Sequence, residues 1–288
     1  MEELENKKKI AQEWFKELRN LICDNFLSIE NESNKNYKHW DNLDCVFERK
    51  NWKRANTKND GGGGTISVMH GKVFEKVGVN ISTVFGEFSD EFKKSIPGAE
   101  QDPRFWASGI SVVAHPRSPF VPIAHMNTRM IVTTKQWFGG GGDLTPIFPI
   151  EKDTSEFHLA FKSVCDTYNT KYYPKYKEWC DKYFFLPHRN EKRGVGGIFF
   201  DSLNSGDWNN DFAYTQDVGR TFINVYSKII RRNMNKKWTS KDRETQSIKR
   251  GRYVEFNLIH DRGTKFGLMT GGNTEAILMS LPPSASWK

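Results

Sequence analysis

Apolar residues follow a helical period at the start of the chain and a strand period further on. Between residues 10 and 30 they recur every three or four positions, which predicts an amphipathic helix. Residues 31–64 are polar, end in the run Gly61–Gly64 and are expected to form a connection. Strand-like stretches interrupted by glycine then follow at 65–88, 105–115, 121–136 and 144–148.

The second half of the chain mixes helical and strand patterns. Residues 155–185 have a helical pattern interrupted at Pro174, GGIFFDSL at 196–203 is typical of a strand, and two helices fit 211–250. The segment RYVEFNLIHDRGTKFGLM predicts a closing hairpin with Gly263 in its turn. Blocks of strands joined by short turns favour an antiparallel sheet covered by helices. We therefore expect one α+β domain.

Composition narrows the class of protein. The N-terminus is charged, and no apolar run approaches the roughly 18–20 residues that span a bilayer. We therefore expect a soluble, cytoplasmic protein without a membrane span. The cysteines are widely spaced and form no CxxC pair, which predicts reduced thiols rather than a disulfide framework or a zinc site; they are Cys23, Cys45, Cys165 and Cys180.

The net charge of +8 comes from one segment. Between Lys228 and Arg252 there are ten basic and two acidic residues, and the rest of the chain is balanced. Such a run is usually a solvated helix face, although it can also bind nucleic acid. We expect the solvated face and no nucleic-acid partner.

A row of polar residues marks the predicted sheet within residues 108–130. His125, Asn127 and Arg129 alternate with apolar neighbours, so in a strand they share one face. Ser111 and His115 share a face of the preceding strand in the same way. A buried polar group without a partner costs about 1–3 kcal/mol, so a core strand normally excludes such residues. The row predicts a polar pocket built on a rigid sheet.

Two further segments carry polar residues whose roles the sequence leaves open. The runs Gly61–Gly64 and Gly139–Gly142 lack the spacing of a phosphate-binding loop. The glycines of WFGGGGDLTP suggest that the backbone bends sharply or passes close to a ligand. Asp143 is then either a turn cap or a site carboxylate. Asp261 and Arg262, at the predicted hairpin turn, are either a solvated pair or ligand-binding groups.

Histidine spacing gives little support for a metal site. The chain has no HxH or HExxH motif, and no GxSxG elbow that would indicate a serine nucleophile. Four histidines from separate elements can still converge on one ion, although a lone histidine is more often a hydrogen-bonded group. These candidates are His115, His125, His158 and His188.

Taken together, several long segments resemble the oxygen-dependent coproporphyrinogen-III oxidases. The resemblance runs from about residue 61 to the C-terminus, whereas the first 60 residues match loosely. The segments that carry it are GVNISTVFGEF, SGISVVAHPRSPFVPIAHMNTR, WFGGGGDLTP, YPKYKEWCDKYFFLPHRNEKRGVGGIFFD, RYVEFNLIHDRGTKFGL and TEAILMSLPP.

The resemblance implies a fold, a reaction and partners. It implies a single domain over 1–288, with a sheet sandwiched between helices, an N-terminal helix and connection at 1–60, and a C-terminal hairpin and dimer-contact region at 253–288. It implies oxidative decarboxylation of two propionates of coproporphyrinogen III to vinyl groups, giving protoporphyrinogen IX in haem biosynthesis. Dioxygen is the co-substrate and the protein is a homodimer. Either no cofactor or a divalent metal is implied.

The resemblance also assigns roles to residues. It implies catalytic roles for His125, as a proton donor, and for Asp261 and Arg262. The implied substrate-binding residues are Ser111, Asn127, Thr128, Arg129, Asp143, Gly271, Gly272 and Asn273. The implied metal ligands are His115, His125, His158 and His188. The family commonly reads Gly-Gly-Arg-Thr-Glu-Ser where this chain has Asn273, so a guanidinium that could hold a propionate is absent there.

The chemistry of the substrate gives these residues physical tasks. Arg129 and Arg262 are suited to the propionates, and the carboxylate of Asp261 is suited to accept the pyrrole N–H groups. The near-neutral pKa typical of histidine suits His125 to proton transfer. Two alternatives are a metal-dependent oxygenase that uses the four histidines and a nucleic-acid binder that uses residues 228–252.

Overall fold

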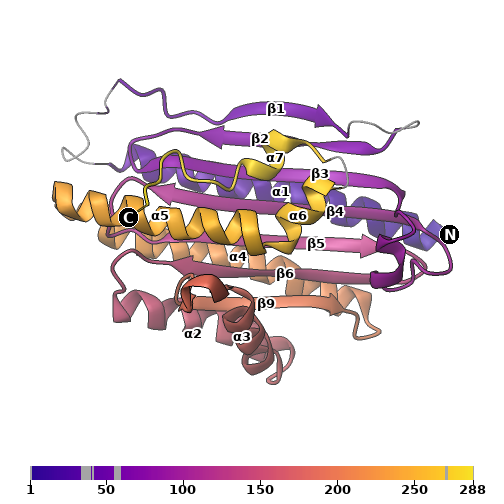
Figure 1. The fold of residues 1–288 in the computed structure, drawn as a ribbon. Helices are drawn as coiled ribbons and strands as arrows, with labels where there is room; N and C mark the ends of the chain where they lie inside the picture. Colours follow the sequence, from indigo (N-terminus) through magenta and orange to yellow (C-terminus); the bar gives the residue numbers. More distant parts are fainter. Residues whose placement is uncertain (1, 34–39, 41, 55–59, 270–271, 288) are drawn as a thin grey trace.

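A seven-stranded antiparallel sheet forms the centre of the protein (Figure 1). The computed structural model describes residues 2–33, 40, 42–54, 60–269 and 272–287. Within them the sheet has the order β1-β2-β3-β4-β5-β6-β9, and each neighbouring pair is antiparallel. The strands are β1 Glu48–Lys53, β2 Gly62–Met69, β3 Phe74–Glu87, β4 Arg104–Pro116, β5 Ile123–Val132, β6 Gln136–Thr145 and β9 Gly196–Leu203. The predicted α+β class is confirmed.

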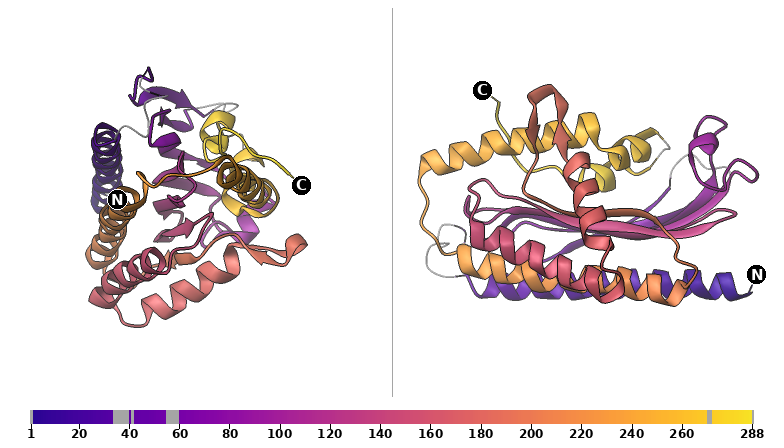
Figure 2. Two further views of the ribbon diagram at one scale, coloured as in Figure 1. Left: turned by 90° about the vertical axis from the view of Figure 1, so that its left-hand side faces the viewer. Right: turned by 90° about the horizontal axis from the view of Figure 1, so that it is seen from below.

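Three long helices cover one face of this sheet (Figure 2). They are α1 Glu2–Asn31, α2 Glu151–Tyr168 and α4 Trp208–Asn233. Their apolar stripes bury side chains such as Leu18 and Phe222 in one cluster with Met126 and Met130 of β5. This cluster is the main hydrophobic core, and it confirms the amphipathic helix predicted near the N-terminus.

The C-terminal part of the chain covers the opposite face (Figures 1 and 2). It comprises α5 Ser240–Glu255, a π-helical turn Phe256–His260, α6 Arg262–Met269 and α7 Thr274–Leu278. Tyr253 of α5 packs on Val113 and Ile123 of the sheet. The sheet is therefore sandwiched between helices, as predicted.

A smaller unit lies beside strand β9. Helix α3, Tyr172–Tyr183, packs along β9 and leads into the two-stranded sheet of β7 Phe185–Leu186 and β8 Glu191–Lys192. Two 3-10 turns, Phe92–Ser95 and Pro187–Arg189, complete the described elements. This unit brings Trp179 and Tyr183, near the end of α3, into one cluster with Phe256 on the face that α5 covers, whereas Tyr176 packs in the main core.

Strand β5 shows the alternation predicted from its sequence. Ala124, Met126, Thr128 and Met130 are buried towards α1 and α4, whereas His125, Asn127 and Arg129 are half-buried on the opposite face. Because side chains two apart share a face, the polar row lies on the side of the sheet that α5 covers. The prediction of a polar face is confirmed.

The predicted closing hairpin is wrong, because residues 253–269 are helical. Tyr253, Phe256 and Asn257 are buried at a spacing of three and four residues, which is the period of a helix face. Asp261 then accepts a hydrogen bond from the backbone N–H of Thr264 at 2.6 Å and caps the start of α6. Gly263 lies within this helix and not in a hairpin turn.

Several boundaries also differ from the prediction. The predicted strand 144–148 is wrong: β6 begins at Gln136 and contains Gly139–Gly142, so these glycines lie in a strand and not at a bend. Strand β1 lies within the predicted polar connection, because an exposed edge strand needs no apolar alternation. The break in the predicted 155–185 helix falls at Asn169, whose backbone is extended, and Pro174 lies in the first turn of α3.

Among the described residues, no helix combines the length and the apolar composition that are needed to cross a membrane.

Candidate active site

Strand register places a carboxylate beside the polar row. His125 of β5 pairs with Asp143 of β6, Asn127 pairs with Gly141, and Arg129 pairs with Gly139. Across the other edge of β5, Ser111 of β4 pairs with Asn127 and is half-buried on the same face. Gly139 and Gly141 carry no side chain, so β6 projects none beside Asn127 and Arg129 on this face.

A buried ion pair orients His125. Asp143 Oδ1 lies 2.9 Å from His125 Nδ1, and Asp143 Oδ2 accepts a hydrogen bond from Arg193 at 2.6 Å. The Asp143 side chain is 2% exposed and that of Arg193 is 3% exposed. Burial acts to raise the pKa of Asp143, but Arg193 and His125 outweigh it and hold this pKa below its ordinary value. Asp143 is therefore a site carboxylate and not a turn cap.

Aromatic rings hold Arg193 in place. Its guanidinium carbon lies 3.8 Å from the ring centre of Phe184, 4.6 Å from that of Tyr253 and 4.8 Å from that of Phe256. It also donates a hydrogen bond to Asn257 at 3.3 Å. Rings on three sides supply cation–π attraction where water is absent. Sequence reasoning missed Arg193, because its partners come from β6, α3, α5 and the π-helical turn.

The hydrogen bonds of Asn127 define the tautomer of His125. Arg129 donates to Asn127 Oδ1 at 3.3 Å, so the amide nitrogen faces the imidazole and donates to His125 Nε2 at 3.1 Å. With Nε2 as acceptor, the proton of neutral His125 resides on Nδ1 and points to Asp143. These two hydrogen bonds fix the orientation of the imidazole ring on the polar face of the sheet.

Asp261 and Arg262 form a second polar group joined through a tyrosine. Tyr183 donates its hydroxyl proton to Asp261 Oδ1 at 2.8 Å and accepts a hydrogen bond from the backbone N–H of Arg262 at 3.0 Å. Burial, together with the nearby Asp261 carboxylate, raises the pKa of Tyr183 to about 12. Asp261 is half-buried and bonded within the protein, so it does not form the solvated pair with Arg262 that the sequence allowed.

Tyr183 connects this group with the polar row. Its ring stacks on Phe199 of β9 at 4.7 Å, and Phe199 pairs with Gly141 in the sheet. The next residue, Phe184, contacts both the His125 ring and the Arg193 guanidinium. One aromatic cluster therefore supports both polar groups. Sequence reasoning missed Tyr183, because nothing in its local pattern separates it from the other aromatic residues of the helix.

The remaining predicted substrate-binding residues lie in different places. Thr128 is fully buried on the α1 and α4 side, so its side chain does not share the face of His125, and its implied role in substrate binding stays a prediction. Asn273 caps α7 by accepting from the Ala276 N–H at 2.9 Å. Gly272 donates its N–H to the carbonyl of Gly267. Gly271 lies outside the described residues.

The four histidines do not form one ligand set. His115 bonds to the carbonyl of Ser280, and His158 bonds to the carbonyl of Val195 and the hydroxyl of Tyr173. His188 bonds to His260 and Glu255, while His125 bonds to Asp143. Burial lowers the pKa of His115 to about 3, so it is a neutral core residue. In the described part of the chain, no three His, Cys, Asp or Glu side chains are grouped to hold a metal. The predicted quartet does not fit a shared ion.

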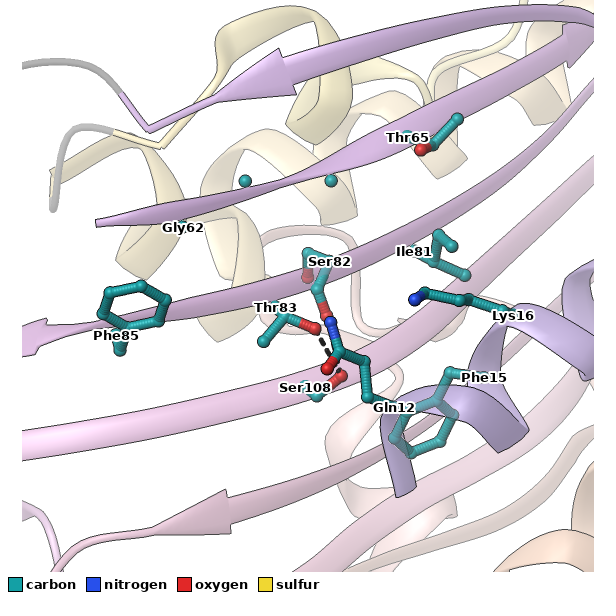
Figure 3. A pocket seen from close by; sticks show the side chains of 12 residues that line it. Gln12, Phe15, Lys16, Gly62, Thr65, Ile81, Ser82, Thr83, Phe85 and Ser108 are labelled. Atoms are coloured by element: carbon teal, nitrogen blue, oxygen red, sulfur yellow. Dashed lines mark hydrogen bonds between the residues drawn. The ribbon is translucent and has the colours of Figure 1, made fainter. Parts of the chain in front are cut away.

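One surface pocket of the protein lies away from this site. It has a volume of about 290 Å³ and lies between α1 and strands β2 to β4 (Figure 3). Gln12 and Lys16 of α1 face the hydroxyls of Thr83 and Ser108, which hydrogen-bond to each other at 2.9 Å. Ser108 is on the face of the sheet that carries Ile110 and Met130, opposite the polar row.

Comparison with known proteins identifies the family. The fold and the polar row already place the chain among α+β proteins with a candidate active site on one face of an antiparallel sheet. The family model described as coproporphyrinogen III oxidase matches residues 11–288. The chain belongs to this family.

Curated relatives match over nearly the whole chain. A protein of Rickettsia bellii (strain RML369-C) named oxygen-dependent coproporphyrinogen-III oxidase is 57% identical over 285 residues, covering 98% of this chain and 99% of the relative. Proteins of the same name from Rickettsia rickettsii (strain Sheila Smith) and Rickettsia felis are 57% and 58% identical, each covering 99% of both chains. The resemblance seen in the sequence is confirmed.

Proposed function

We propose that this chain oxidatively decarboxylates two propionates of coproporphyrinogen III with dioxygen and releases protoporphyrinogen IX. The observation that carries the proposal is the orientation of His125 by a buried Asp143–Arg193 pair, on the same face of the sheet as Arg129. The family model is described as coproporphyrinogen III oxidase, and the curated relatives are named oxygen-dependent coproporphyrinogen-III oxidase, which supports the proposed substrate and the use of dioxygen. A cytoplasmic location remains a prediction.

The overall chemistry requires a proton donor. Each propionate loses carbon dioxide and one hydrogen from its β-carbon, and the two electrons released reduce dioxygen to hydrogen peroxide. The balance consumes one dioxygen and one proton for each vinyl group formed. His125 is held by Asp143 at Nδ1, and we infer that it delivers that proton from Nε2 once the substrate has displaced the Asn127 amide that donates to Nε2 in this structure.

The other polar groups bind and orient the substrate. Arg129 and Arg262 hold propionates, because guanidinium groups match the geometry of carboxylates. Asp261 has one hydrogen bond to each oxygen from the protein, which leaves lone pairs for pyrrole N–H groups. Asn127 and Ser111 are proposed to complete the binding surface. No step is assigned to a metal, because the four histidines do not share a site.

We also propose a homodimer formed through the C-terminal region. Leu258, Ile259, Leu268, Met269 and Trp287 are large apolar side chains that are 43–67% exposed. All five lie between residues 258 and 287 of the chain, and exposed apolar side chains that form a contiguous patch are typical of interaction surfaces. Sedimentation equilibrium of the purified protein should give twice the monomer mass, and a monomer at micromolar concentration would contradict the dimer.

A double-mutant cycle on His125 and Asp143 tests the proposed proton donor. If Asp143 acts through His125, His125→Gln and Asp143→Asn should each lower kcat by roughly 10²–10⁴-fold, and the double variant should fall little further. Independent, multiplying effects would contradict this arrangement. Asp217→Asn, on the exposed face of α4, is the matched control and should turn over normally.

A further inference from the structure

Arg129 is held on both sides by protein groups, and one of them lies outside the row predicted from the sequence. Its guanidinium donates to Asn127 Oδ1 at 3.3 Å and pairs with Asp201 Oδ2 at 3.0 Å. The side chains of Arg129 and Asp201 are 29% and 28% exposed, so the pair is neither free in solvent nor sealed in the core. The bond to Asn127 uses one of the five N–H groups of the guanidinium, and the Asp201 carboxylate lies beside the guanidinium as its counter-charge.

The backbone of β9 is irregular where it supplies Asp201. Gly140 pairs with Phe200 and Phe138 pairs with Leu203, so β9 has one extra residue opposite Gly139. Ser202 has a φ of 56°, in the left-handed region, and its N–H donates to Asp201 Oδ1 at 3.0 Å. Such a bulge leaves one residue without its hydrogen bond to the neighbouring strand and changes the direction in which a side chain points. Here it fixes the Asp201 carboxylate over the sheet.

Gly139 makes room for this pair. A Cβ at position 139 would lie 2.7 Å from Asp201 Oδ1 and 3.0 Å from the guanidinium carbon of Arg129. The ion pair therefore passes directly over the glycine, between strands β5 and β9. A side chain at this position would separate the two charges.

We propose that Asp201 is a positioning residue that holds Arg129 in the orientation that receives a substrate propionate. This inference rests on the proposed function, because it takes Arg129 as a carboxylate-binding group. A guanidinium fixed on two sides presents its remaining N–H groups in one direction, so less conformational entropy is lost when a carboxylate binds. Asp201 does not contact the reacting carbon atoms in this account and acts through Arg129.

Steady-state kinetics with coproporphyrinogen III test the proposal. Asp201→Ala should raise KM about tenfold, the size expected for one charge-assisted hydrogen bond, with kcat within about twofold of the parent. Gly139→Ala should raise KM in the same direction by displacing the pair. Asp166→Asn, which removes the charge that pairs with Lys162 on α2, is the matched control and should leave both constants unchanged.

A double-mutant cycle separates positioning from a general structural effect. In an Arg129→Ala background, Asp201→Ala should have almost no further effect on KM, because the group through which it acts is gone. An unchanged or lowered KM in Asp201→Ala, or a full additional effect without Arg129, would overturn the inference alone. Absence of turnover by the unsubstituted protein would overturn the proposed function and this inference with it.

Discussion

At the scale of single residues, the site depends on buried groups that have partners. Asp143, although almost fully buried, keeps a lowered pKa because Arg193 supplies a positive charge within hydrogen-bond distance. Removing one member of such a pair leaves an uncompensated buried charge, which costs about 3–5 kcal/mol. Arg193 is therefore expected to be as sensitive to substitution as Asp143, although it does not face the open surface.

Tyr183 provides a residue-scale prediction. Tyr183→Phe removes the hydroxyl that donates to Asp261 Oδ1 and accepts from the backbone N–H of Arg262, so the Asp261 side chain loses one of its two hydrogen bonds and the start of α6 loses a backbone contact. We expect kcat/KM to fall roughly 10- to 100-fold, in line with about 1.5–3 kcal/mol for a hydrogen bond to a charged group.

The control for this substitution is a second tyrosine. Tyr173→Phe removes a hydroxyl that bonds only to His158, away from the polar row, and should leave kcat/KM near the parental value. Equal losses in the two variants would contradict the role given to Tyr183. A large loss of kcat/KM in Tyr173→Phe alone would indicate that His158 takes part in the reaction.

Short-range alternation in the sequence was sufficient to predict the polar row itself. A period of two is a local property of strand β5, so His125, Asn127 and Arg129 could be placed on one face before the fold was known. Asp143 could not be placed, because only the register of β6 brings it opposite His125. Arg193, Asp201 and Tyr183 come from distant elements and have no local signal.

At the scale of elements, an ion-pair cluster joins strand β3 to helix α5. Glu75 of β3 accepts a hydrogen bond from Arg243 at 2.6 Å and lies 2.8 Å from the guanidinium of Arg250 in an ion pair, and Arg250 is fully buried. Burial acts to raise the pKa of Glu75, but the two guanidinium groups outweigh it and lower this pKa to about 2. The cluster fixes α5, which carries Tyr253 and leads to Asp261.

This cluster predicts a pH dependence of stability. Because the folded-state pKa of Glu75 is below the usual value of 4.5, its contribution is fully present above about pH 4.5 and is lost as the pH falls towards 2. Glu75→Gln should lower the free energy of unfolding at pH 7 by roughly 3–5 kcal/mol, and the difference from the parent should shrink in acid. Urea unfolding from pH 7 to pH 3 measures both effects.

The matched control for Glu75 is an exposed glutamate. Glu178→Gln, which breaks a surface pair with Lys182, should change stability little at any pH. A difference between Glu75→Gln and the parent that stays constant down to pH 3 would contradict the assignment of the acid sensitivity to this cluster.

The C-terminal elements show where local reasoning fails. The run YVEFNLI contains β-branched and aromatic residues and is compatible with a strand, yet its buried positions follow a helical period. The choice is made by the surface of the sheet that Tyr253 and Phe256 pack against, which is a tertiary effect. The prediction also missed most of strand β6, because its glycine-rich composition disfavours a strand. Pairing with β5 on one side and β9 on the other supports the strand in the fold.

At the scale of the whole molecule, the two faces of the sheet have different roles. The face covered by α1, α2 and α4 is an apolar core, and the other face carries the polar groups beneath the C-terminal elements (Figure 2). The basic run predicted between Lys228 and Arg252 is not a single charged surface. Arg250 is buried, and Arg232 and Arg243 pair with carboxylates of α2 and β3. The electrostatic basis for a nucleic-acid binder is therefore weak.

Oxygen-dependent turnover of coproporphyrinogen III by the purified protein tests the central claim most directly. The measurement compares air with strict anaerobiosis, each with and without a chelator, and follows protoporphyrinogen IX, carbon dioxide and hydrogen peroxide. The account predicts conversion in air alone, unaffected by the chelator, with one peroxide for each vinyl group formed. Conversion without dioxygen, or no conversion in any condition, would contradict it.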